Sequence, residues 1–96
     1  MDIERIASME QRLDRTLSAV GALESALEQY SSTMDDIAAL EAYLGSPEWL
    51  CDRKADEAGQ LPQDMKRGVL SEDAIWNLLE RNRELRTEMK HIIQTR

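Results

Sequence analysis

Few residues in this chain are of the types that catalyse reactions, and their spacing assembles no catalytic set. His91 is the only histidine and Cys51 is the only cysteine. A nucleophilic triad needs a base beside its nucleophile, and nothing in the sequence context pairs these two residues. We interpret His91 as a surface residue and Cys51 as a half-buried, inert thiol. The sequence therefore predicts no catalytic residue and no enzyme activity.

Carboxylates near the middle of the chain are the candidates for an ion site, namely Asp52, Asp56, Glu57 and Asp64. One histidine and one cysteine cannot supply a usual zinc set. The run from Asp52 to Asp56 superficially resembles a calcium loop, but its glycine and closing glutamate are misplaced. Asp52 and Asp56 would share a helix face and pair with Lys66 or Arg67, or stay solvated. Pairing is favoured, and we expect neither a metal nor a cofactor.

The charge of the chain is negative and unevenly spread. The net charge is −7, and no Lys or Arg lies between Thr16 and Ser46, where Glu24, Glu28, Asp35 and Asp36 fall. Such a chain repels the phosphate backbone and anionic lipids, so we expect neither direct nucleic-acid binding nor membrane binding. The acidic stretch is either a solvated face or a surface that binds a basic partner or mimics nucleic acid.

Two tryptophans could serve as anchors, either inside the protein or in an interface. Trp49 falls in the middle of the chain, and Trp76 falls near the start of the last helical segment. Tryptophan dominates many interfaces, but packing against the core is the favoured interpretation for both. We include Trp49 and Trp76, with the four acids above, in a candidate partner surface.

Residues 2–44 carry a heptad pattern of apolar side chains. One seam runs Ile6, Leu13, Val20, Leu27, Met34, Glu41, and the other runs Met9, Thr16, Leu23, Tyr30, Ile37, Leu44, with Thr16 and Glu41 as the polar exceptions. The unbroken phase favours one helix, whereas Ser31-Ser32-Thr33 favours a break, because such side chains compete for backbone hydrogen bonds. We prefer two helices. Gly45 then ends the pattern, and Ser46 is expected to cap a short helix from Pro47 to about Ala58.

The last segment, Ser71 to about Gln94, has the clearest helical pattern. Gly68 is expected to supply an unusual backbone angle, and the Ser71 side chain to cap the helix. Its apolar stripe is Ile75, Leu78, Asn82, Leu85, Met89 and Ile92, with Leu79 and Ile93 beside it. The pattern predicts an all-α fold, a small antiparallel bundle of three main helices plus one short connecting helix. Residues 1–96 should form a single domain, with the Ile75–Ile92 stripe packed on the Ile6–Leu27 stripe.

Several of these residues together resemble a known family. They are Glu4-Arg5-Ile6, Met9-Glu10, Tyr43, Ser46, Trp49, Asp52, Asp56-Glu57, Gly59, Leu61-Pro62 and the run Gly68 to Asp73. The pattern is similar to that of domain-of-unknown-function family 4298 (DUF4298), and it covers nearly the whole chain. The run Gly68 to Asp73 is the most specific part. This resemblance implies a bacterial source and assigns no activity, ligand or partner.

Together, these observations favour a cytoplasmic, non-enzymatic protein-interaction module. It would act as an adaptor, a regulatory subunit or an inhibitor, with another protein as its partner. The alternative is a small-ligand or ion-binding domain that uses the region from Trp49 to Asp73. Because the heptad pattern is long for a chain of 96 residues, a homodimer is also compatible with the sequence.

Overall fold

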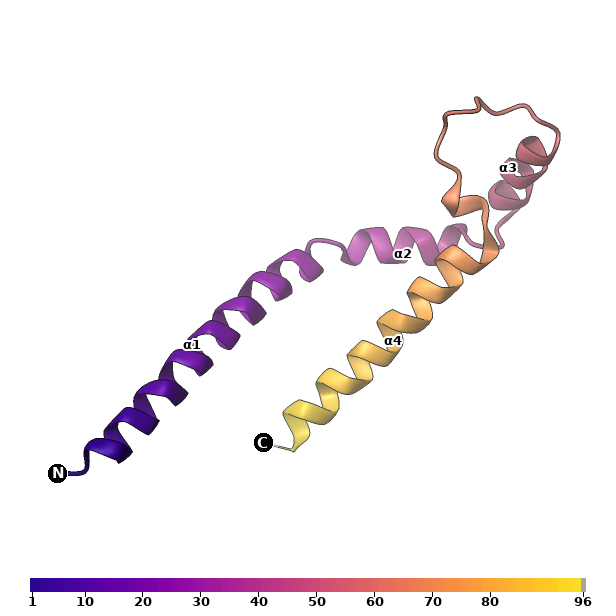
Figure 1. Ribbon diagram of the computed structural model, residues 1–96. Helices are drawn as coiled ribbons and strands as arrows, with labels where there is room; N and C mark the ends of the chain where they lie inside the picture. Colours follow the sequence, from indigo (N-terminus) through magenta and orange to yellow (C-terminus); the bar gives the residue numbers. More distant parts are fainter. Residues whose placement is uncertain (96) are drawn as a thin grey trace. The chain divides into compact units, whose positions relative to one another are not determined.

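The computed structural model describes residues 1–95, and all of their regular structure is helical. The elements are α1 (Ile3–Ser31), α2 (Met34–Tyr43), α3 (Pro47–Glu57), the short 3₁₀ turn η1 (Gly68–Leu70) and α4 (Glu72–Gln94) (Figure 1). The all-α class is thus confirmed. The chain divides into two units, Met1–Met34 and Asp35–Arg96, which are described separately below.

The first unit consists almost entirely of α1. Its 29 residues extend about 43 Å at 1.5 Å per residue. The helix begins after Asp2, whose carboxylate accepts a hydrogen bond from the Arg5 amide at 3.0 Å. No residue of α1 is buried, and the apolar side chains of its heptad seams are about half exposed, from 47% at Leu27 to 57% at Met9.

The expected break between the first two helices is confirmed. α1 ends at Ser31, and α2 begins at Met34. The Ser32 hydroxyl donates to the Gln29 carbonyl at 2.6 Å, and the Thr33 hydroxyl donates to the Tyr30 carbonyl at 2.7 Å. Such side-chain bonds to the last carbonyls compete with continued helical bonding, and the Thr33 amide also donates to the Tyr30 carbonyl at 3.0 Å.

The expected ends of α3 are confirmed as well. Gly45 follows α2 with a φ of 77°, a left-handed conformation that glycine adopts without steric cost. The Ser46 hydroxyl then accepts a hydrogen bond from the Trp49 amide at 3.1 Å, and Pro47 is the first helical residue. At the other end, Gly59 has a φ of 71°, so the chain leaves α3 through a second left-handed glycine.

The entry into α4 differs in two details from the expectation. Ser71 does occupy the N-cap position, but its side chain makes no capping hydrogen bond. The Ser71 amide instead donates to the Gly68 carbonyl at 3.1 Å, so the turn η1 directs the chain into α4 through its backbone. Gly68 has no positive φ, because this right-handed turn does not require one.

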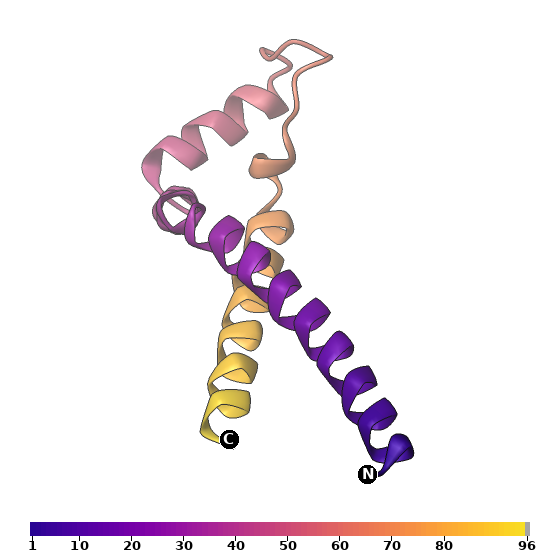
Figure 2. The same ribbon diagram turned by 90° about the vertical axis from the view of Figure 1, so that its left-hand side faces the viewer.

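The buried core of the second unit joins α3, η1 and α4. It consists of Trp49 (4% exposed), Leu70 (8%), Ile75 (3%) and Leu79 (7%). The turn η1 contacts both α3 and α4, and the two views in Figures 1 and 2 show it beside each of them. Ile75 and Leu79 are four residues apart and therefore share the helix face that meets this core.

The buried residues of α4 differ from the apolar stripe that the sequence predicted for this helix. Leu79, which was expected to lie beside the stripe, is buried, whereas Leu78 and Leu85 of the stripe are 48% and 49% exposed. The face of α4 that carries Ile75 and Leu79 is the buried one, and the turn η1 contacts this helix. The antiparallel packing of α4 on α1 and the single domain concern both units together and stay predictions.

We expect Leu79→Ala to lower the free energy of unfolding by about 2–5 kcal/mol, because it removes a buried side chain from a small core. Chemical denaturation measures this loss. Asn77→Ala is the matched control, since Asn77 is an exposed residue of the same helix, and it should change stability by less than about 0.5 kcal/mol. Equal effects of the two substitutions would show that Leu79 is not part of the core.

Candidate functional site

Trp49 is held inside the second unit by its ring nitrogen as well as by its apolar surface. The indole Nε1 donates to the Val69 carbonyl at 2.9 Å. This hydrogen bond gives the N–H group of the buried tryptophan the acceptor that it needs. On the ring face, the Arg53 guanidinium lies 5.1 Å from the ring centroid, a cation–π geometry. Trp49 is therefore a core anchor, and its inclusion in the candidate partner surface is wrong.

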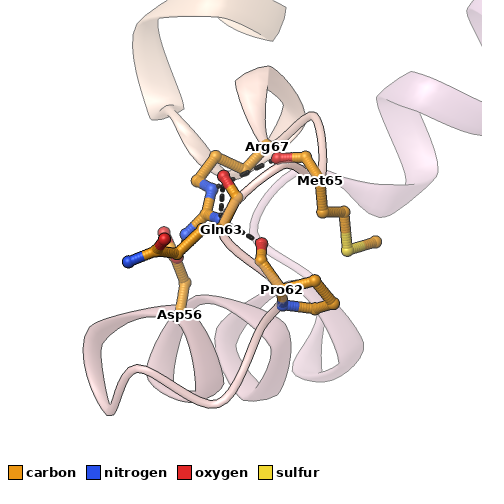
Figure 3. A network of polar contacts seen from close by, with 5 residues as sticks. All are labelled: Asp56, Pro62, Gln63, Met65 and Arg67. Atoms are coloured by element: carbon orange, nitrogen blue, oxygen red, sulfur yellow. Dashed lines mark hydrogen bonds and ion pairs between the residues drawn. The ribbon is translucent and has the colours of Figure 1, made fainter.

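Arg67 fixes the connection between α3 and η1 (Figure 3). Its Nη2 donates to the Pro62 carbonyl at 2.6 Å and, at the long distance of 3.4 Å, to the Gln63 carbonyl. Its Nε lies 3.4 Å from the Met65 carbonyl, and its Nη1 forms an ion pair with Asp56. A planar guanidinium can serve several acceptors at once, which a lysine ammonium cannot do with the same geometry.

A second polar contact joins the end of α2 to α3. The Tyr43 hydroxyl donates to the Asp52 carboxylate at 2.7 Å. This hydrogen bond raises the pKa of the Tyr43 phenol above its ordinary value of 10.0, and some desolvation and the negative charge of Asp52 act in the same direction. The neutral phenol is thus the form that the folded protein favours.

Two of the four carboxylates that were candidates for an ion site, Asp52 and Asp56, therefore act as structural partners, whereas Asp64 is exposed. Asp56 pairs with Arg67, as the sequence predicted, and Asp52 accepts the Tyr43 hydroxyl. Glu57 lies 3.8 Å from Arg53 in an exposed contact, which contributes little to stability. Within the described residues, no group of three or more histidine, cysteine or acidic side chains is placed to hold a metal.

Two open hollows adjoin each other on the second unit. One has a volume of about 330 Å³ and an apolar lining of Leu40, Gly68, Val69, Ala74, Ile75 and Leu78. The other has about 210 Å³, with Tyr43 and Asp52 beside Leu61, Met65, Val69 and Leu70. Lys66 lines both. The small-ligand alternative for the region from Trp49 to Asp73 would use the second hollow, and it stays a prediction.

The remaining members of the candidate partner surface are exposed. Glu24 and Glu28 lie on α1, Asp35 and Asp36 in the first turn of α2, and Trp76 on α4. Trp76 is 54% exposed, so the core packing favoured for it is wrong, because the buried face of α4 carries Ile75 and Leu79 instead. None of the four acids forms an ion pair within the described residues. No helix among those residues combines the length and apolarity needed to cross a membrane.

Cys51 and His91 lie apart from both hollows. Cys51 is exposed on α3, so the half-buried position expected for it is wrong. The reason is that α3 turns Trp49 inward, which places the residue two positions later on another face. His91 is exposed in the last turn of α4, as expected. The part of the chain that the structure describes gives neither residue a hydrogen-bonded partner side chain.

Comparison with known families identifies the chain. The family described as "Domain of unknown function (DUF4298)" has a model that matches residues 6–92. The chain belongs to this family. The match confirms the resemblance seen in the sequence and includes every residue of the buried core and of the Arg67 network. No protein with a curated description matches the chain, and neither does any solved structure.

The Tyr43–Asp52 hydrogen bond predicts a pH dependence at alkaline pH. Tyr43 should titrate above 10.0, and Asp52→Asn should lower its pKa. Because the pKa is raised in the folded state, the stabilisation is fully present below pH 10.0 and is lost as the pH rises through the raised pKa. NMR of ring-labelled tyrosine measures both titrations, and Tyr43→Phe assigns the signal. An unchanged Tyr43 titration in Asp52→Asn would contradict the contact.

Proposed function

We propose that the protein is a non-enzymatic interaction module of the bacterial cytoplasm that binds a basic protein partner, as an adaptor, regulatory subunit or inhibitor. The observation that supports this function is the exposure of Glu24, Glu28, Asp35 and Asp36, none of which is in an ion pair within the described residues. An unneutralised acidic surface attracts a basic partner and raises the rate of encounter.

Long-range attraction alone does not hold a complex together, so the partner needs an apolar anchor. Trp76 is the best candidate, because it is 54% exposed and lies close to Glu72 and Asp73 in the first turn of α4. An aromatic ring beside carboxylates suits the long side chain of arginine or lysine, whose stem packs on the ring while its charge meets the acids.

We also propose that the antiparallel bundle predicted from the sequence forms, with the α4 stripe on the α1 stripe. The positions that flank the two seams support this arrangement. If Leu27 packs beside Leu85, the residues that directly follow the seam face each other across the antiparallel helices, so Glu24 faces Arg86 and Leu17 faces Ile93. In this bundle Arg86 engages Glu24, and Glu28, Asp35 and Asp36 are the acids that remain for a partner. A shift by one heptad in either direction would instead oppose Glu24 to an apolar residue, Leu79 or Ile93. Opposite charges and matched apolar residues therefore favour a single register.

The bundle has a direct test in stability. If α4 packs on α1, Leu85→Ala should lower the free energy of unfolding by about 2–5 kcal/mol. If Leu85 stays half exposed, the loss should be below about 1 kcal/mol. Chemical denaturation separates the two results, and Glu84→Ala, at an exposed neighbouring position, is the control. A small loss for Leu85→Ala would refute the proposed packing.

The partner surface is tested by reversing its charge. A variant with lysine at Glu28, Asp35 and Asp36 should recover less of the partner from lysate of the native host. With the purified partner, higher ionic strength should slow association of the unaltered protein, because salt screens the attraction. The control reverses Glu48, Asp64 and Glu84, which are also exposed, so both variants have the same net charge. Equal recovery by both variants would show that the acidic stretch is only a solvated face.

A further inference from the structure

The N-terminal part of α1 carries an apolar stripe of its own. Ile3, Ile6, Met9 and Leu13 are between 50% and 71% exposed. Ile6, Met9 and Leu13 follow the heptad phase of the helix, and Ile3 widens their stripe, so the four side chains lie along one face. A face of this kind is normally covered by another helix.

In the antiparallel bundle proposed above, α4 is too short to cover this face. Leu40 of α2 lines a hollow together with Ala74, Ile75 and Leu78 of α4, so the first turns of α4 lie beside α2. The rest of α4, residues 79–94, extends about 24 Å. In the antiparallel bundle that length reaches from Ser31 back to about Thr16. Residues 3–15 of α1 therefore project about 20 Å beyond the end of α4.

The charges beside this projecting stripe favour a second copy of the same segment. Arg5 directly precedes the seam residue Ile6, and Glu10 directly follows the seam residue Met9. In two parallel helices in register, these flanking positions of opposite chains face each other across the seam. Each dimer would thus gain two Arg5–Glu10 pairs between chains. Neither residue is in an ion pair within one chain in the described residues.

The opposite orientation is disfavoured by the same charges. In an antiparallel pair, residues that precede the seam face each other. Arg5 would then lie opposite Arg12, or Arg12 opposite its own copy, depending on the register. The β-branched side chain of Ile6, at the first seam position, also suits a parallel two-stranded contact.

We propose that residues 3–15 of α1 form a parallel two-stranded contact with the same residues of a second copy of this chain. This inference rests on the antiparallel bundle proposed above, but not on the acidic partner surface. The contact contains four apolar side chains from each chain, so the dimer is weak and depends on concentration. It leaves the acids at positions 24–36 and Trp76 outside the dimer contact.

Sedimentation equilibrium over a range of protein concentrations tests the proposal. The unaltered protein should change from monomer to dimer as its concentration rises. Arg5→Glu or Glu10→Arg alone should weaken the dimer about tenfold or more, because each makes both flanking pairs repulsive. The double variant R5E/E10R should restore dimerisation, since it exchanges the charges and recovers the pairs. A monomer at every concentration, or a dimer that both single variants leave unchanged, would overturn the proposal.

Disulfide trapping tests the orientation and the extent of the contact in a Cys51→Ser background. Met9→Cys should form a disulfide-linked dimer on mild oxidation, because equivalent seam residues meet in parallel helices. Leu23→Cys should not form a cross-link, since α4 covers that part of the seam in the proposed bundle. Gln11→Cys should not form one either, because it lies on the outer face of the helix. Circular dichroism checks that every variant is helical. A cross-link at Leu23→Cys, or none at Met9→Cys, would refute the contact, whereas Leu85→Ala reports separately on the bundle.

Discussion

The burial of Trp49 is the constraint on which the second unit depends. Its indole nitrogen needs an acceptor once the ring leaves water, and the Val69 carbonyl provides one at 2.9 Å. That hydrogen bond fixes the turn η1 against α3. Leu70, the next residue, enters the core, and α4 begins directly after the turn. The turn that leads into α4 is therefore held in place by one tryptophan of another helix.

The polar contacts around this core hold the irregular part of the chain. Arg67 ties the connection after α3 to Asp56 and to the backbone, and Tyr43 ties the end of α2 to Asp52. Both contacts use carboxylates that the sequence alone offers as possible ion ligands. Because Asp56 pairs with Arg67 and Asp52 accepts the Tyr43 hydroxyl, these two carboxylates stabilise the fold. The acids that are free to attract a partner lie elsewhere on the chain.

The proposed functions use exposed surfaces outside the buried core. In the proposals made above, the acids from Glu28 to Asp36 attract a basic partner, Trp76 offers an apolar contact, and the N-terminal part of α1 pairs with a second copy. These three features lie on different stretches of the chain and serve separate tasks. A dimer of this kind would present two acidic surfaces, and linked binding sites raise the overall affinity for a partner that contacts both.

Local signals in the sequence determined the helices and most of their ends. Gly45, Ser46, Pro47 and Gly59 act through their own backbone preferences, so α3 could be placed without a structure. The pairing of Asp56 with Arg67 was predicted by charge. Core packing was favoured for Trp49. Contacts that depend on several elements were not predictable: the burial of Leu79, the exposure of Trp76 and Cys51, and the acceptor role of three backbone carbonyls for Arg67. Periodicity shows that a helix has an apolar face, but only the neighbouring elements decide which side chains on that face are buried.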